Sequence, residues 1–184
     1  MNNIGGFLVY FAYKYKGDYE KIYEAIKNKE QINNEEVQSL LSELKYQYIT
    51  LLDRDYPDKL KTMPNPPFVI FYDGNKQLLQ KTDLVCFVIN ENTKYSDGLI
   101  EDVVFNRDDC YVENLDCDTE DVVLKSCKKH NKKIIYVGID KDSKGDENTL
   151  YIQETPPEIV IDSGCDYLNN RLVDYLSNHT IEIN

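Results

Sequence analysis

Two proline elbows in front of a short apolar run most constrain how this chain folds. Tyr56-Pro57 and Asn65-Pro66-Pro67 precede five consecutive apolar or aromatic residues at positions 68–72. Proline fixes φ, removes a backbone donor and pushes the residue before it toward extended geometry. The run is too short for a helix, is rich in β-forming residues and ends at the turn signal Asp73-Gly74. The sequence therefore predicts a buried strand that a tight turn closes.

Beyond this strand, apolar runs alternate with helical patterns. Residues 84–89 are all apolar, which is typical of a central parallel strand covered on both faces. Strands alternating with helices predict an α/β fold of the Rossmann type, with a mostly parallel sheet flanked by helices. We expect further strands at 48–52, 110–112, 134–137 and 180–183, a short apolar segment at 159–161, a helix or loop at 96–105, and helices at 119–130, capped by Asp118, and at 167–176.

Three short helices are expected ahead of the first strand. Helical periodicity runs through residues 4–16 and 18–28, the second with Asp18 as N-cap, and resumes after Asn33-Asn34. The chain is therefore predicted to comprise a small helical module at residues 1–46 and a Rossmann-like domain at residues 47–184.

The formal net charge of −12 is concentrated in the second part of the chain. Residues 83–184 carry 22 acidic and 10 basic side chains, whereas residues 1–82 carry 11 of each. Ten carboxylates and a single cation, Arg107, lie between Asp97 and Asp121. The ordinary interpretation of such charge is a solvated acidic face. Proteins bind nucleic acid through Lys and Arg side chains. The negative charge of this part of the chain therefore disfavours binding to a phosphate backbone at ordinary salt concentrations.

Other classes of function find little support in the sequence. Five cysteines at irregular spacing, without a CxxC pair, suit neither a disulfide framework nor a zinc site, so reduced thiols are expected. No apolar run reaches the length of a membrane span and no signal peptide opens the chain, which predicts a cytoplasmic protein without membrane contact. No nucleophile stands with a base, and no nucleotide or metal motif is complete. We therefore expect no enzyme activity, metal site or cofactor, and we expect His130, near a helix end, to be solvated.

The segment at residues 54–75 resembles the entry segment of the DprA/Smf family of DNA-processing proteins, in both the spacing and the order of its prolines, apolar run and glycine. A second likeness lies at residues 167–177, which are similar to a family helix of pattern Phe-x-x-Arg-Asn-Arg-x-Ile and keep Arg171. The resemblance covers about residues 46–184 and implies a Rossmann-like domain that binds single-stranded DNA. Because the chain ends short of the family's remaining sheet and C-terminal region, the resemblance implies a truncated member.

The two loops that meet DNA in this family are degenerate here. The family follows its first central strand with Gly-Ser/Thr-Arg, whose arginine meets a DNA phosphate, and the aligned residues here are Ile89-Asn90-Glu91. After the next strand the family has Ser-Gly-x-Ala-x-Gly-Ile-Asp, where this chain has residues 113–120, which are rich in carboxylates. Exchanging Arg for Glu replaces a bidentate phosphate clamp by repulsion. The degenerate positions are Ile89, Asn90, Glu91, Glu113, Asn114, Asp116 and Asp118.

The resemblance and the altered loops together predict a DprA-like protein that has lost its phosphate-binding loops. Such a protein would act by protein–protein interaction, as a regulator or antagonist of DNA-processing, recombination or defence factors. Its partner would be a full-length DprA-like protein, a recombinase or a defence factor, and the sequence also leaves a homodimer open.

Two alternatives stay open. In the first, the chain retains weak binding of single-stranded DNA or a nucleotide through its remaining cations. In the second, the carboxylates of residues 97–121, with Asp116, Asp118 and Glu120 foremost, mimic a nucleic-acid phosphate track toward a basic partner. The cations of the first alternative are Lys94, Arg107 and Arg171, together with the lysines at positions 128, 129, 132 and 133.

Overall fold

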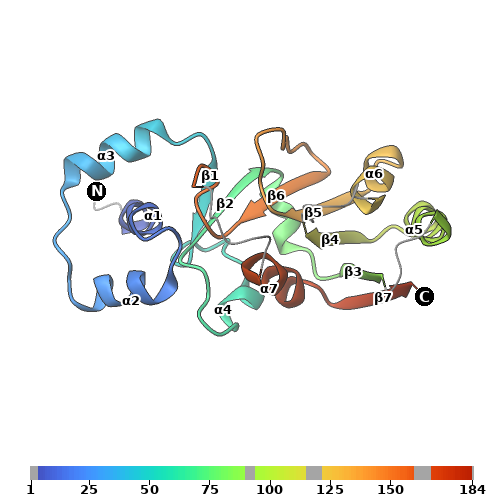
Figure 1. Cartoon of the computed structure of the whole chain (residues 1–184), viewed down its shortest axis with the longest axis horizontal. Coiled ribbons are helices and arrows are strands. Elements are labelled where there is room, and N and C mark those ends of the chain that lie inside the picture. Colours follow the sequence, from blue (N-terminus) through green and yellow to red (C-terminus); the bar gives the residue numbers. More distant parts are fainter. Residues whose placement is uncertain (1–3, 90–93, 115–121, 160–166, 184) are drawn as a thin grey trace. The chain divides into compact units, whose positions relative to one another are not determined.

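The chain contains a seven-stranded sheet, with helices before and between its strands (Figure 1). This computed structural model describes residues 4–89, 94–114, 122–159 and 167–183. The strand order is β1-β2-β6-β5-β4-β3-β7, and the predicted α/β class with a mostly parallel sheet is confirmed. The strands are β1 (Gln47–Thr50), β2 (Val69–Gly74), β3 (Leu84–Ile89), β4 (Cys110–Asn114), β5 (Lys133–Val137), β6 (Thr149–Gln153) and β7 (His179–Ile183). The helices are α1 (Ile4–Lys14), α2 (Tyr19–Lys27), α3 (Asn34–Glu43), α4 (Asp58–Lys61), the 3-10 helix η1 (Lys76–Gln80), α5 (Lys94–Asn106), α6 (Val122–Lys129) and α7 (Tyr167–Leu176).

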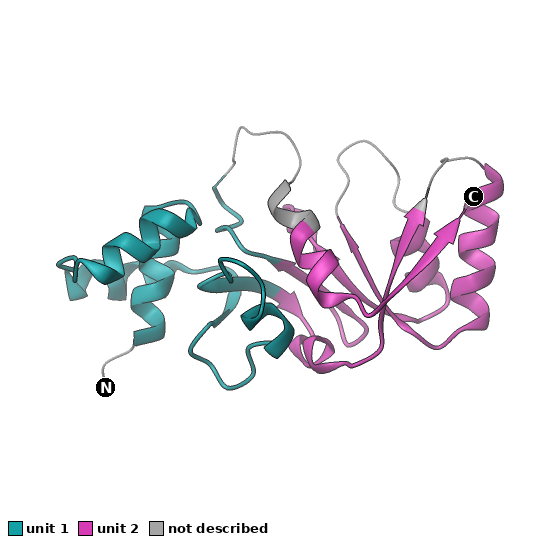
Figure 2. Cartoon of the chain, turned by 90° about the horizontal axis from the view of Figure 1, so that it is seen from below, with its two compact units in different colours: residues 1–72, 153–162 teal, residues 73–152, 163–184 magenta. Residues whose placement is uncertain are grey.

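The chain divides into two compact units whose boundaries fall inside strands β2 and β6 (Figure 2). Unit 1 consists of residues 1–72 and 153–162, and unit 2 consists of residues 73–152 and 163–184. The predicted division between residues 46 and 47 separates a helical module from a Rossmann-like domain, and it stays a prediction.

Unit 1 contains the three predicted helices and the antiparallel pair β1 and β2. Helix α2 begins after Asp18, whose carboxylate accepts a hydrogen bond from the Lys21 amide at 3.1 Å, as expected of an N-cap. Asn33 caps α3 in the same way. The helices are held by an apolar cluster that includes the buried side chains of Phe11 and Ile22.

The two proline elbows are bonded to each other within unit 1. Tyr56 is buried, and its hydroxyl donates to the Pro67 carbonyl oxygen at 2.8 Å. Pro57 is the N-cap of the short helix α4. Strand β2 then begins at Val69 with four buried residues in succession, so the predicted buried strand is confirmed. It ends at Gly74, and the chain turns directly into η1.

Unit 2 contains parallel strands in the order β6-β5-β4-β3-β7. Strand β3 has β4 on one side and β7 on the other, so the order of strands reverses at β3. Residues 84–87 are buried, as predicted for a strand covered on both faces, whereas Val88 is 45% exposed. The register of β3 and β7 runs from Val85↔His179 to Ile89↔Ile183.

Strand β6 is missing from the sequence-based prediction, which is corrected here. It pairs with β5 in parallel from Ile134↔Thr149 to Val137↔Ile152, and Leu150 is fully buried. The strand has only three apolar residues in succession after a polar loop. Its extended state therefore depends on pairing with β5, a tertiary contact that local sequence does not report.

The remaining element predictions differ in how far the structure describes them. Residues 96–105, left open between helix and loop, are helical within α5. Helix α6 is described from Val122 onward, so the proposed cap Asp118 and residues 119–121 lie outside the described residues. Of the apolar segment at 159–161, only Ile159 is described.

The cysteines that the structure describes are buried thiols. Cys86, Cys110 and Cys127 are free, as predicted, and burial raises the pKa of the Cys110 thiol to about 11. Cys117 and Cys165 lie outside the described residues. Within the described ranges, no helix combines the length and the apolar character that a membrane crossing requires.

Within unit 2, the end of β2 lies against the loop that precedes β6. A side chain at Gly145 would collide with the backbone of Asp73 and Gly74. Gly74 itself has φ of 109°, in the region that favours glycine. The Asp73 carboxylate accepts from the Gly145 amide at 3.2 Å, and the Asn75 side chain donates to the Glu147 carbonyl oxygen at 2.9 Å. Two glycines thus permit a close approach of two backbone segments.

Gly145→Ala is expected to lower the free energy of unfolding by about 1–3 kcal/mol, because the added methyl group meets main-chain atoms that cannot rotate away. Gly98→Ala in α5 is the matched control. Apart from the adjoining backbone of α5 itself, no atom of the described residues lies within 4 Å of a Cβ at Gly98. Alanine is also the better helix former by about 0.5–1 kcal/mol. Urea unfolding measures both variants. A Gly145→Ala protein as stable as the wild type would contradict the close approach.

Candidate functional site at the carboxyl edge of the parallel sheet

The carboxyl ends of β3 and β4 define the candidate site. In doubly wound sheets, ligands bind outside the carboxyl ends of the strands, where the first turns of the following helices supply backbone donors. Strand β3 ends at Ile89 and α5 begins at Lys94, while β4 ends at Asn114 and the described part of α6 begins at Val122. We call the ends of these two strands and the first turns of these two helices the carboxyl edge.

A carboxylate joins the two strands at this edge. Backbone pairing of β3 with β4 is recorded at Leu84↔Cys110 and Val85↔Tyr111. Farther along, the Glu113 Oε1 atom accepts a hydrogen bond from the Phe87 amide at 2.9 Å. A charged acceptor of this kind forms a stronger bond than a neutral one. The Phe87 amide is therefore committed within the protein, and a negative charge lies between the ends of β3 and β4.

The structure describes three of the seven degenerate positions. Ile89 ends β3 and pairs with Ile183, and Glu113 and Asn114 end β4. The other four positions lie outside the described residues; they are Asn90, Glu91, Asp116 and Asp118. Among the residues that are described, no group of three or more His, Cys, Asp or Glu side chains is placed to hold a metal ion.

The cations predicted to bind nucleic acid do not gather at one place. Lys94 is the first residue of α5, whereas Arg107 follows its last residue. A helix of 13 residues is about 20 Å long, so these two side chains belong to opposite ends of the helix. The guanidinium of Arg107 forms an ion pair with Asp109. Arg171 lies in a third element, α7.

The predicted lysine cluster at the end of α6 and the start of β5 is also divided among separate acceptors. Lys128 Nζ lies 3.2 Å from the Tyr151 hydroxyl, and Lys132 Nζ lies 3.6 Å from an Asp108 carboxylate oxygen. Lys129 forms an ion pair with Glu101 of α5. Three of the four lysines therefore have acceptors within unit 2, which reduces the charge available to a phosphate backbone.

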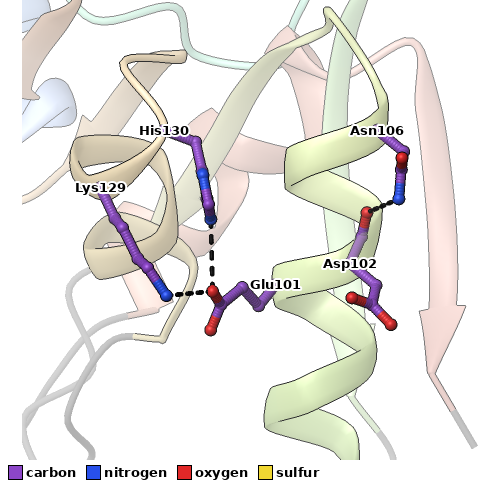
Figure 3. A network of polar contacts seen from close by, with 5 residues as sticks. All are labelled: Glu101, Asp102, Asn106, Lys129 and His130. Carbon is purple, nitrogen blue, oxygen red and sulfur yellow. Dashed lines mark hydrogen bonds and ion pairs between the residues drawn. The ribbon is translucent and has the colours of Figure 1, made fainter.

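Glu101 links α5 to the end of α6 (Figure 3). It accepts from Lys129, and its Oε1 atom lies 3.3 Å from His130 Nε2. The His130 ring also meets the Phe105 ring edge to face, with 5.1 Å between centroids, and its side chain is 17% exposed. The prediction of a solvated His130 is therefore wrong, because the neighbouring helix α5 covers the ring. Hydrogen bonds from Lys129, first, and from His130 hold the pKa of Glu101 below its ordinary value.

A groove of about 420 Å³ runs between α5 and α6 and reaches the carboxyl edge. We call it the α5–α6 groove. Its lining combines three lysines with two carboxylates and three small or apolar residues. The lining residues are Lys94, Asp97, Gly98, Glu101, Val122, Lys125, Ser126 and Lys129.

Sequence reasoning named Lys94 and Lys129 of this groove as candidate cations, and its mimicry alternative included the carboxylates of Asp97 and Glu101. It missed the others, although their spacing carries a signal. Positions 94, 97, 98 and 101 of α5 and positions 122, 125, 126 and 129 of α6 both follow the pattern i, i+3, i+4, i+7. This pattern places four residues on one face of each helix. Which faces oppose each other is decided only by the packing of the two helices.

The strand order and the flanking helices define an α/β protein of the Rossmann type. Residues 47–101 match the model of a protein family described as DNA recombination-mediator protein A. No curated protein sequence matches the chain.

Two solved structures share the fold. DNA processing protein A (DprA) from Streptococcus pneumoniae is 18% identical, with a TM-score of 0.65 over 89% of this chain and 59% of that protein. DNA processing protein A from Helicobacter pylori, which binds single-stranded DNA, is also 18% identical, with a TM-score of 0.58 over 75% of this chain and 69% of that protein. The chain thus spans 59% of the length of the S. pneumoniae structure. The fold and the family match over residues 47–101 confirm the predicted resemblance to the DprA family.

Two substitutions separate the structural role of Glu113 from its charge. Glu113→Ala leaves the Phe87 amide without the Glu113 acceptor and is expected to lower the free energy of unfolding by about 1–3 kcal/mol. Glu113→Gln keeps an acceptor oxygen and is expected to change it by less than about 1 kcal/mol. Hydrogen exchange at the Phe87 amide should accelerate in the first variant alone. Equal protection in both variants would show that the side chain does not hold this amide.

The lowered pKa of Glu101 predicts a pH dependence. The charged carboxylate contributes stability above its ordinary pKa of 4.5, and this contribution is lost as the pH falls below 4.5 through the lowered pKa. Glu101→Gln is therefore expected to lose less stability than the wild type on acidification through this range. Asp102→Asn, an exposed position one residue further along α5, is the control. The melting temperature of each variant is measured from pH 7 to pH 3. Parallel curves of melting temperature against pH for wild type and Glu101→Gln would refute the prediction.

Proposed function

We propose that this chain is a DprA-like protein of DNA processing that is not an enzyme, does not hold a DNA phosphate at its carboxyl edge and acts by binding another protein. The observation that carries the proposal is the Glu113 carboxylate, bonded to the Phe87 amide at 2.9 Å between the ends of β3 and β4. In this architecture the same edge ordinarily offers backbone donors to an anion.

The electrostatic repulsion between the Glu113 carboxylate and a nearby phosphate would weaken the binding of DNA. Two unit charges of like sign 4 Å apart repel each other by about 4 kcal/mol at an effective dielectric constant of about 20. This energy corresponds to a loss of about a thousandfold in affinity. A lysine at the same distance from the phosphate would attract it by a similar energy, so the carboxylate matters most where no cation lies equally close.

A protein partner from DNA processing is consistent with the likeness of the chain to DNA processing protein A. The likeness of the fold to that of DNA processing protein A supports a role in DNA processing. Within this setting, we propose a full-length DprA-like protein, a recombinase or a defence factor as the partner. The mimicry alternative depends on Asp116, Asp118 and Glu120, which lie outside the described residues.

A second candidate function is residual binding of single-stranded DNA. The observation that favours it is the lysine lining of the α5–α6 groove, where Lys94 stands at the carboxyl edge and Lys125 and Lys129 follow along α6. The H. pylori protein with this fold binds single-stranded DNA. Binding of this kind would depend steeply on salt, since each phosphate contact releases a counterion.

Filter binding of oligothymidine at low and at moderate salt separates the two candidates. We expect no micromolar, salt-sensitive retention by the wild type, and a severalfold gain in retention for Glu113→Gln, because it removes the charge and keeps an acceptor. Glu35→Gln, an exposed position in α3 of unit 1, changes the net charge equally and should have no effect. Micromolar binding by the wild type that weakens steeply with salt would overturn the proposed function.

A further inference from the structure

A row of aromatic rings lies on the surface of unit 1. Tyr19 and Tyr23 of α2 stack with 6.1 Å between their ring centroids, and Phe68, just ahead of β2, stacks on Tyr19 at 4.9 Å. Ile26 continues the row, because positions 19, 23 and 26 of α2 follow the pattern i, i+4, i+7. We call these four side chains the aromatic row. We propose that it binds an extended, proline-rich segment of a protein partner that carries a basic residue beside its prolines.

This inference rests on the proposed function only for the existence of a protein partner. It goes beyond that function, because it names a surface in unit 1 and the chemistry of the segment that this surface recognises. The carboxyl edge of the sheet takes no part in it.

The aromatic row is apolar surface that the described part of the chain leaves open. Tyr23 is 45% exposed and Ile26 is 40% exposed, whereas Ile22 and Ala25, on the adjoining face of α2, are buried with Phe11. Contiguous exposed apolar surface marks sites of interaction. Tyrosines are frequent anchors of protein interfaces, and rings that are already stacked lose little conformational freedom on binding.

The hydroxyl groups of the row favour an extended ligand. Neither Tyr19 nor Tyr23 donates its hydroxyl to any of the described residues. A helical partner satisfies its own backbone carbonyl groups, and an added β-strand needs the backbone of another strand, which the row does not offer. A polyproline II segment has no internal hydrogen bonds, so its carbonyl groups can accept from tyrosine hydroxyls while its prolines pack on the rings. One turn of such a segment, about 9 Å, is comparable in length with the row of three rings.

The charges beside the row complement a basic residue on the ligand. Glu24 pairs with Lys27 at 3.1 Å and Asp18 pairs with Lys21 at 2.8 Å, so these four charges balance one another. Glu20, one turn of the helix before the second tyrosine, is exposed and forms no ion pair within the described ranges. The charge that remains beside the row is therefore negative. It attracts a lysine or arginine and disfavours single-stranded nucleic acid, whose bases would otherwise stack on aromatic rings.

The test uses the full chain labelled with ¹⁵N and two peptides with blocked ends, an arginine followed by six prolines and an arginine followed by a glycine–serine repeat of equal length. The proline peptide is expected to shift the amide resonances of Tyr23 and Ile26 in a saturable way, and the glycine–serine peptide is not. Tyr23→Ala should weaken binding of the proline peptide at least tenfold. Tyr95→Ala, which removes an exposed tyrosine from α5 of unit 2, is the matched control and should bind as the wild type does.

Two further variants separate the hydroxyl and the charge from the apolar contact. Tyr23→Phe keeps the ring and is expected to weaken binding severalfold through loss of the donor. Glu20→Lys should weaken the arginine-headed proline peptide severalfold and leave a serine-headed one unchanged. Glu35→Lys, at an exposed position of α3 in the same unit, should leave both peptides unchanged. Unaltered melting temperatures would show that all these exposed substitutions leave the fold intact.

Three outcomes of the titrations would refute the inference. Absence of shifts at Tyr23 and Ile26 would remove the aromatic row as a binding surface, and equal shifts with the glycine–serine peptide would remove its preference for proline. Both leave the proposed function standing, because it depends on the carboxyl edge. Saturable shifts with oligothymidine, lost in Tyr23→Ala, would assign the row to nucleic acid. Glu113→Gln would then leave the oligothymidine affinity unchanged, which separates this outcome from DNA binding at the carboxyl edge.

Discussion

The parallel pairing of β3 with strands on both sides is the constraint on which unit 2 depends. Val85 pairs with both β4 and β7, and Leu84 pairs with β4. Both side chains are buried. Toward the carboxyl edge, the Glu113 side chain reaches the Phe87 amide and bonds β4 to β3 there. An internal acceptor at this position means that the edge is held together by a charge that an anionic ligand would have to meet.

This single bond connects the fold to the proposed function. Where the backbone of a doubly wound sheet ordinarily faces an anion, the edge carries a carboxylate. The lysines at positions 128, 129 and 132, between the last turn of α6 and the start of β5, have acceptors of their own. The groove between α5 and α6 combines three lysines, two carboxylates and a helix glycine in its lining.

Local patterns predicted the elements well where the signal was strong. The apolar run of β3, the elbows before β2 and the cap at Asp18 all appear where the sequence placed them. Strand β6 was missed because three apolar residues after a polar loop resemble many loops, and pairing with β5 makes them a strand. His130 was predicted to be solvated because its neighbours in sequence are lysines, whereas Glu101 and Phe105 cover it from another helix.

The sequence by itself determined the α/β class, the likeness to the DprA family and the presence of a glutamate where a ligand loop begins. Periodicity, proline and glycine positions and residue type are local properties, so they can be read from the chain. Only the tertiary structure decided that Glu113 bonds to Phe87, that the predicted cations fall at separate places and that two helix faces enclose a groove. Each of these depends on distances between residues far apart in sequence, and such distances arise from packing.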